Sequence, residues 1–482
     1  MFWRGVIGYL PVQAAQALAG FGAIVVFTRQ LSPADYGTYA LAFSVSSVVY
    51  TLGLTWIEAA MARFYVAERE RGDVGALYGS LYRAYAVCAV GALGLGALAV
   101  FLAPLSAAVR FAILAGLGSV AVRSLLKLAQ ERRRAAGEVR GFAVIDMIQT
   151  AGGFLLGALL AWAGFGAAAP LAGAGAASAV CLIWALPSEL PSAHAGRFDA
   201  ERLKGYAAYG LPVAMSLVLS LALATTDRFV LAAFMDASTV GAYHAGYSLS
   251  NRTLDVMFLW LGMAGHPAAV AALERGGEAA LRATASSQAS LMLLLAVPAA
   301  VGLALVSQPL AHLMVGPELA DRSAHVTPWI AIGALFSGLT THYLHTSFTL
   351  SRKTRLQFVA VAIPAALNLV LTLVLIPRFG LDGALWATAV SYGVGLVASY
   401  LLMQRCLPLP VPWGALARVL AASALMAVVV LALPSPGGLY EILLKASAGA
   451  LVYILAALAL DAGGARSQGM GRALRFAQRS AA

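Results

Sequence analysis

Long apolar runs separated by short polar breaks are the dominant pattern of the sequence. A helix needs roughly 20 apolar residues to cross the hydrocarbon core of a bilayer, and such runs recur until about Leu460. The pattern predicts fourteen membrane-spanning helices, at residues 5–28, 36–57, 82–104, 108–129, 141–163, 166–187, 205–226, 240–264, 288–314, 325–350, 356–376, 381–403, 412–433 and 440–460. Because the breaks are too short to bury a core of their own, we expect an all-α, polytopic integral membrane protein.

The first polar break, TRQLSPADYG from Thr28 to Gly37, predicts a tight turn on the outer side of the membrane. Pro33 suits either a turn or the first residue of a helix, since its missing N–H group costs nothing at either position. Gly37 lacks a side chain, so it permits another backbone to approach closely.

Two features of the first half recur in the second half, in the same order. Leu10-Pro11-Val12 and Gly37-Thr38-Tyr39 correspond to Leu211-Pro212-Val213 and Gly241-Ala242-Tyr243, and GFGAAAPLAG from Gly164 corresponds to RFGLDGALWA from Arg378. Chance recurrence among Ala, Gly and Pro is the alternative to a true repeat. Each copy holds six spans, an even number, so a true repeat is parallel. It predicts six-helix bundles at residues 1–204 and 205–408, and two extra spans with a basic cytoplasmic tail at residues 409–482.

Charge then indicates the orientation. The chain is 61% apolar and only 11% charged, yet its net charge is +11. A positive net charge could indicate a protein that binds nucleic acid. Most of the lysines and arginines, however, flank spans on one side of the predicted membrane, as they do in cytoplasmic loops. We therefore expect both termini inside, basic residues facing anionic membrane lipids, and no nucleic-acid partner. Cys88, Cys181 and Cys406 are far apart and predict neither disulfides nor a metal site.

Two arginines lie within or at the edge of predicted spans, and a charge at that depth must face protein or water. They are Arg228 and Arg252, which flank the second Gly-x-Tyr turn at similar predicted depth. Asp227 and Asp255 lie beside them. In one reading Asp227 pairs with Arg252 and Arg228 with Asp255, purely as structure. In the other, an anionic ligand displaces a carboxylate and takes bidentate contacts from the arginines.

Other spans carry polar residues three positions apart, which places each pair on one helix face. The pairs are Gln13 with Gln16, Asp146 with Gln149, and His342 with His345; Asn251 and Asn368 are further amides within spans. These side chains could line a hydrophilic cleft that binds hydroxyl groups of a ligand, with Asn251 beside its anionic group. The alternative is that each pair makes a hydrogen bond between helices.

Four features together resemble the polysaccharide transporter family of the multidrug, oligosaccharidyl-lipid and polysaccharide exporter superfamily, that is, the Wzx-type flippases. They are RQLSPADYGTYAL from Arg29, TTDRFVLAAFMDASTVGAYHAGYSL from Thr225, ALNLVLTLVLIPRFGLDGALWAT from Ala366, and the fourteen-span layout. The resemblance implies alternating access that moves an undecaprenyl-diphosphate-linked oligosaccharide from the inner to the outer leaflet of the bacterial cytoplasmic membrane. It also implies a polysaccharide polymerase and a chain-length regulator as partners, while related multidrug exporters share the fold.

Energy coupling and catalysis are constrained by what the sequence lacks. It contains no G-x-x-x-x-G-K-[ST] phosphate loop, so we expect no nucleotide or other cofactor and no metal. Asp227, Asp255 and Glu58 are candidate proton or sodium sites, and His342 and His345 could titrate near neutral pH. A membrane polymerase or ligase would need substantial outer loops, so we expect no enzyme. An ion-coupled drug or cation antiporter is the stronger alternative, because one fold serves both functions.

Overall fold

The computed structural model describes residues 2–464 and 466, and every regular element in that part of the chain is a helix. This confirms the predicted all-α membrane fold. Contacts divide the chain into two compact units, Met1–His244 and Ala245–Ala482. The bundle boundaries inferred from the repeat, after residues 204 and 408, stay predictions. Most of the basic tail lies outside the described residues.

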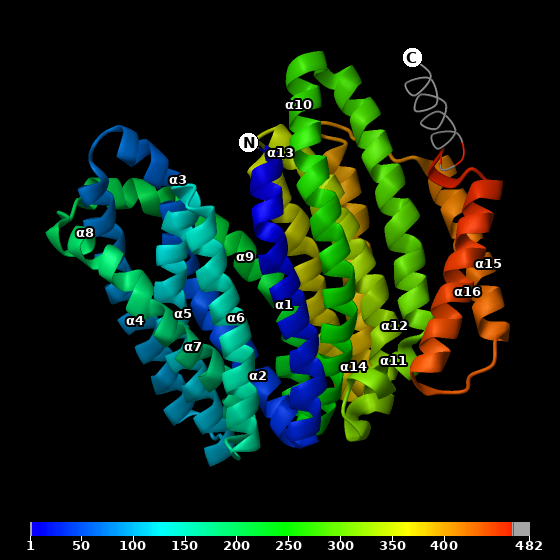
Figure 1. The fold of residues 1–482 in the computed structure, drawn as a ribbon, viewed down its shortest axis with the longest axis horizontal. Helices are drawn as coiled ribbons and strands as arrows, with labels where there is room; N and C mark the ends of the chain where they lie inside the picture. Colours follow the sequence, from blue (N-terminus) through cyan, green and yellow to red (C-terminus); the bar gives the residue numbers. More distant parts are fainter. Residues whose placement is uncertain (1, 465, 467–482) are drawn as a thin grey trace. The chain divides into compact units, whose positions relative to one another are not determined.

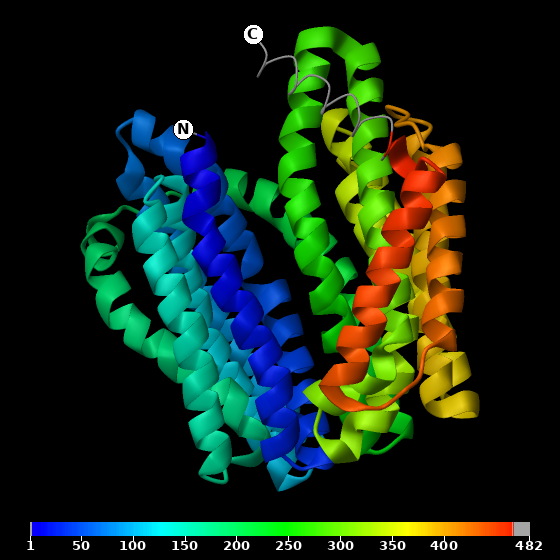
Figure 2. The same ribbon diagram turned by 45° about the vertical axis from the view of Figure 1, so that its right-hand side comes forward.

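The first unit is built around α5, which packs against α2, α3, α4 and α7, while α6 lies between α1 and α7 (Figures 1 and 2). Its core includes Ile57, Met61 and Leu77, which are fully buried. The helices are α1 (Phe2–Gln30), α2 (Pro33–Gly53), α3 (Thr55–Glu70), α4 (Val74–Leu102), α5 (Ala107–Ala135), α6 (Val139–Trp162), α7 (Ala169–Ala185), α8 (Leu190–Ala195), α9 (Ala200–Phe234) and the first turns of α10 (Ala237–Leu305).

The second unit contains two long helices that each break at a glycine. In α10 the break is Gly277, with φ 64°, and in α14 (Thr354–Met403) it is Gly380, with φ 56°. Only glycine adopts a positive φ easily. At each of these glycines the helix turns back on itself (Figure 1). The unit's other helices are α11 (Ser307–Met314), α12 (Pro317–Leu339), a π-helical turn (Thr340–Leu344), α13 (His345–Leu350), α15 (Trp413–Ala432) and α16 (Gly438–Ala459).

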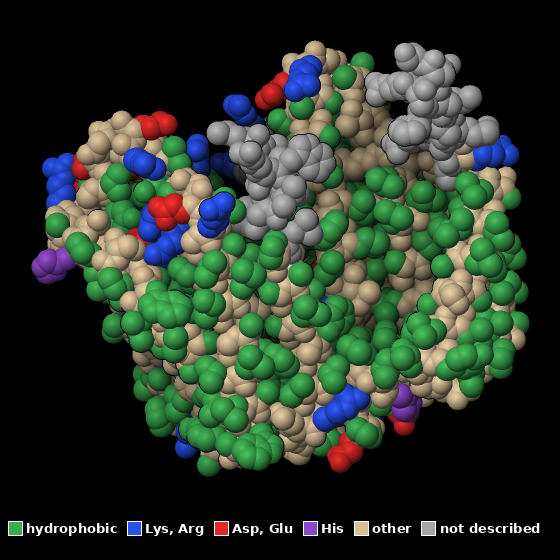
Figure 3. Space-filling model, in the orientation of Figure 1, with side chains coloured by type: hydrophobic (Ala, Val, Ile, Leu, Met, Phe, Trp, Pro, Cys, Tyr) green, Lys and Arg blue, Asp and Glu red, His purple; other side chains and the backbone are tan. Residues whose placement is uncertain are grey.

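Ten helices of the described chain are long and apolar enough to cross a membrane, or eleven when α2 and α3, bent by 47°, form one span. The chain is therefore a multi-pass membrane protein. The count takes α10 and α14 once each, although each contains two predicted spans. Hydrophobic side chains cover the middle of the face drawn in Figure 3, and charged side chains gather near its two ends. The number fourteen and the orientation stay predictions.

The turn predicted around Pro33 is a capped helix start. Pro33 is the first residue of α2, and the Ser32 hydroxyl accepts a hydrogen bond of 3.1 Å from the Asp35 N–H, which otherwise lacks a helical partner. Gly37 permits the expected close approach, because a Cβ at this position would lie 1.7 Å from the Ala237 carbonyl oxygen. A Cβ on Gly241 would lie 2.8 Å from the Pro33 oxygen. The two glycines that the predicted repeat would pair thus pack at one crossing.

The basic end of α5 is partly buried, which changes how topology must be tested. Arg132 donates from Nε to the fully buried Glu189 carboxylate at 3.0 Å, and it also pairs with Glu138. Arg133 donates to the Ser188 hydroxyl at 2.9 Å and is only 6% exposed. A cysteine at position 133 would therefore escape labelling from either side, whereas Arg134 is exposed.

The predicted topology can be tested by labelling single cysteines in a variant without native cysteines. Cysteines at Arg134 and Lys353 are expected to react only with reagent that reaches the cytoplasm, because basic loops stay inside. Cysteines at Ala34 and Pro436 are expected to react from outside. All four positions are exposed in the structure. Labelling of position 134 or 353 from outside would contradict both the predicted orientation and the span count.

Candidate functional site

Arg252 presents a guanidinium group on the surface of α10 in the second unit. Its side chain is exposed and, within the described residues, makes no hydrogen bond or ion pair. Asn251 donates a hydrogen bond to Asp255, one turn along the helix. The carboxylate is thus held by the amide, so the guanidinium retains its full set of N–H donors for a ligand.

Arg228 has different surroundings in the first unit. It is 4% exposed, it donates from Nη1 to the Ala224 carbonyl at 2.8 Å, and its guanidinium carbon lies 6.0 Å from the centroid of the Tyr243 ring. Tyr243 donates from its hydroxyl to Asp227 at 2.5 Å. Tyr243 is not among the site residues predicted from the sequence, although it is the tyrosine of the second Gly-x-Tyr turn. Arg228 is thus a buried, packed cation, in contrast to the exposed Arg252.

The polar pairs on α1 and α6 take part in contacts between helices. Gln16 donates to Asp146 at 2.8 Å, which joins α1 to α6, and Gln149 donates to Ser178 at 2.9 Å, which joins α6 to α7. Gln13 is half-buried one turn before Gln16. The structure therefore realises the interhelical alternative for Gln16, Asp146 and Gln149. The first of these bonds remains exposed, so its groups can still contact a polar ligand.

The two histidines pack within the second unit. The His342 ring stacks on Phe258, with centroids 5.9 Å apart and planes at 9°. His345 is buried, with Nε2 3.3 Å from the Ser399 hydroxyl. Both lie at the π-helical turn and the start of α13. These contacts match the interpretation of membrane histidines as partners of neighbouring helices.

Glu58 and Asn368 are buried polar groups with unused hydrogen-bonding atoms. Tyr50, at the end of α2, donates to Glu58 at 2.6 Å across the bend between α2 and α3. The second carboxylate oxygen has no partner among the described residues. Asn368 is completely buried, and neither atom of its amide finds a partner there. A buried polar atom without a partner is costly, so the Glu58 carboxylate suits binding of a proton or a small cation, and the Asn368 amide oxygen suits a small cation.

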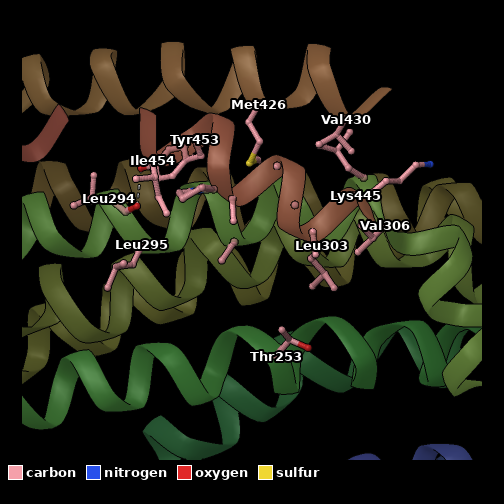
Figure 4. Close-up of a pocket in the computed structure, with 17 residues that line it drawn as sticks. Thr253, Leu294, Leu295, Leu303, Val306, Met426, Val430, Lys445, Tyr453 and Ile454 are labelled. Carbon is pink, nitrogen blue, oxygen red and sulfur yellow. Dashed lines mark hydrogen bonds between the residues drawn. The ribbon is translucent and has the colours of Figure 1, made fainter. Parts of the chain in front are cut away.

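An apolar groove lies among α10, α15 and α16 of the second unit, with a cavity volume of about 490 Å³. Figure 4 shows side chains of all three helices directed into it. It reaches Thr253, the residue after Arg252. Nothing in the sequence indicated that a groove at the last two helices extends to the helix that carries Arg252.

No metal centre is built into the part of the chain that the structure describes. No group of three or more His, Cys, Asp and Glu side chains there has the arrangement to hold a metal ion. Cys88, Cys181 and Cys406 are free thiols.

Comparisons with known proteins identify one family and several solved structures of similar fold. A family model described as "Polysaccharide biosynthesis protein" matches residues 26–324. No curated protein matches the sequence. Among solved structures, the lipid II flippase MurJ in an inward closed conformation is similar with a TM-score of 0.77 and 13% identity, over 95% of this chain and 99% of that chain.

Two transporters of the MOP superfamily are also similar. An inward-facing multidrug resistance MATE transporter of the MOP superfamily gives a TM-score of 0.62 at 12% identity, over 82% of this chain and 95% of that chain. A MOP superfamily transporter from Pyrococcus furiosus, whose binding pocket is described as having reverse polarity, gives 0.57 at 12% identity with the same coverage. At these identities the likeness establishes the fold, and function must be argued from the site.

Proposed function

Because the chain belongs to the polysaccharide biosynthesis protein family, we propose that it is a flippase for an undecaprenyl-diphosphate-linked oligosaccharide. It moves this substrate from the inner to the outer leaflet of the bacterial cytoplasmic membrane by alternating access. The observation that carries the proposal is that α10 holds both Arg252, an exposed cation, and residues that line an apolar groove. A lipid-linked diphosphate combines these two chemistries in one molecule.

Arg252 binds the diphosphate in this proposal. A guanidinium group offers two parallel N–H donors to phosphate oxygens, and such charge-assisted bonds are stronger than neutral ones. Asn251 adds an amide beside it, although the carboxylate of Asp255 holds that amide in the structure. In the first unit, the buried Arg228 is a separate candidate for the diphosphate, and the exposed Gln16–Asp146 pair is a separate candidate for sugar hydroxyls.

The polyprenyl chain occupies the groove in this proposal. Burial of apolar surface stabilises a bound hydrocarbon by roughly 25 cal/mol per Å², and most groove residues are apolar. Coupling to an ion gradient involves one of the acidic residues Glu58, Asp227 and Asp255. Asn368 is a separate, neutral candidate in the second unit. A polymerase and a chain-length regulator remain the proposed partners.

Reconstitution tests the function directly. Purified protein in proteoliposomes is expected to transfer an undecaprenyl-diphosphate-linked fluorescent oligosaccharide between leaflets, which an impermeant glycosidase detects as new accessibility. An ion-coupled antiporter would instead move an organic cation such as rhodamine 6G. Cation transport without any glycolipid transfer would favour this second function. The exposed Arg252 disfavours it, since a cation cargo would be repelled.

Filling the groove is expected to stop transport without unfolding the protein. A Cβ at Gly302 would have nothing within 4 Å, and this residue lines the groove. Gly302→Trp therefore places an indole where the hydrocarbon chain would lie, and most of the transport activity should be lost at normal thermal stability. Gly118→Trp is the matched control, because Gly118 on α5 also has open space around it. Equal transport by the two variants would show that the groove stays empty during flipping.

A further inference from the structure

The groove has one charged end. Among the described residues that line it, Lys445 is the charged side chain, and the others are apolar except Thr253 and Tyr453. Figure 4 shows Lys445 and Val306 at one end of the groove, and Leu294, Leu295 and Ile454 toward the other. A hydrocarbon groove that ends in a primary ammonium matches an amphiphile with an anionic head group.

The charged end lies where three helices meet the outer side of the predicted membrane. Val306 follows the last residue of α10, Val430 is in the last turn of α15, and Lys445 is in the second turn of α16. At 1.5 Å per residue, Lys445 lies about 10 Å from the start of α16. The loop between α15 and α16 is predicted to be outside. The groove therefore runs from the outer part of the predicted membrane past its middle, with its cation toward the outer surface.

The ammonium of Lys445 is positioned and partly neutralised by its neighbours. It donates to Glu441 at 2.6 Å and to the Ser435 hydroxyl at 2.9 Å, and only 11% of the side chain is exposed. Glu441 also accepts a hydrogen bond of 2.9 Å from the Gly437 N–H. An ammonium carries three N–H donors, so one remains for a ligand oxygen.

We propose that Lys445 and the apolar groove form an outer-leaflet binding site for the polyprenyl diphosphate carrier. This site binds the phosphate of the carrier after flipping and before release. This inference rests on the proposed function and adds to it the site from which the flipped product leaves the protein. Glu441 limits the net positive charge at this end, so the phosphate binds less tightly than at an unneutralised cation. Such weakened binding suits release.

The test compares binding of undecaprenyl diphosphate without glycan to the purified full-length protein, measured by native mass spectrometry. Loss of a charge-assisted hydrogen bond is expected to weaken binding by about tenfold in the double variant Lys445→Gln/Glu441→Gln. Glu441→Gln alone leaves an uncompensated ammonium, so binding should tighten and product release should slow. Arg418→Gln, at the opposite end of α15, is the matched control and should bind as the wild type does.

Each outcome separates this inference from the proposed function. Unchanged binding by the double variant, with flipping intact in the wild type, would overturn the outer-leaflet binding site alone. Equal competition by phosphatidylglycerol would identify a site for ordinary bilayer phospholipid and would also overturn it. Binding of undecaprenyl diphosphate that depends on Lys445, in a protein that flips no glycolipid, would overturn the proposed function and leave the binding site standing.

Discussion

Arg252→Ala is expected to abolish transport of the glycolipid while the protein folds normally. The side chain is exposed and makes no hydrogen bond or ion pair within the described residues, so its removal disturbs no internal contact. It does remove the bidentate donors that hold the diphosphate. Arg252→Lys keeps the charge but loses the planar fork, so partial transport should remain. Flipping in proteoliposomes, normalised to folded protein, measures both effects.

A second exposed arginine on the same helix provides the control. Arg282 lies beyond the Gly277 break and is 57% exposed, with only a long contact of 3.9 Å to Glu278. Arg282→Ala should transport at the wild-type rate. Arg228→Ala should be as damaging as Arg252→Ala, with lower thermal stability as well, because Arg228 is buried. Full transport by the Arg228/Arg252 double alanine variant at normal expression would remove the main support for a diphosphate cargo.

Gly37→Ala is expected to destabilise the first unit and to stop transport. The new Cβ would lie 1.7 Å from the Ala237 oxygen, far inside contact distance, and the obstacle is backbone. Either α2 or the start of α10 must move, and such overpacking typically costs about 1–3 kcal/mol. Thermal unfolding of the purified protein, measured beside its flipping rate, tests the effect.

Gly94→Ala is the control, because it also replaces a glycine by alanine, at a position where the new Cβ has room. Gly94 is also within a helix, α4, and a Cβ there would meet nothing within 4 Å. Because alanine favours helix by about 1 kcal/mol over glycine, this variant should be at least as stable as the wild type. If Gly37→Ala proved equally stable, the close crossing of α2 and α10 would not be required for the fold.

Local signals predicted the membrane fold well. The Pro33 start and the Gly37 approach depend on residue types whose backbone limits are strong. The region between residues 264 and 288 shows where such reasoning failed, because it was taken as a polar break and is helix up to Gly277 and beyond. Its alanines and Glu274 and Arg275 favour helix intrinsically, which a search for apolar runs does not detect.

The candidate site was harder to predict, because burial depends on distant parts of the chain. Arg228 and Arg252 look alike in sequence, yet one is buried and the other is exposed. Asp255 lies three residues after Arg252, yet it accepts its hydrogen bond from Asn251. Lys445 belongs to none of the motifs in the sequence. The place of Lys445 in a groove depends on α10, which contributes the opposite wall of that groove.

The buried end of α5 has a consequence for how the protein is made. Under the predicted orientation, Arg132 and Arg133 help to retain this end in the cytoplasm during insertion, when anionic lipids attract them. Glu189 is synthesised later, and in the folded chain it withdraws both guanidinium groups from the surface. Depletion of anionic lipid should therefore impair the insertion of new chains, whereas protein already folded should keep this end in place.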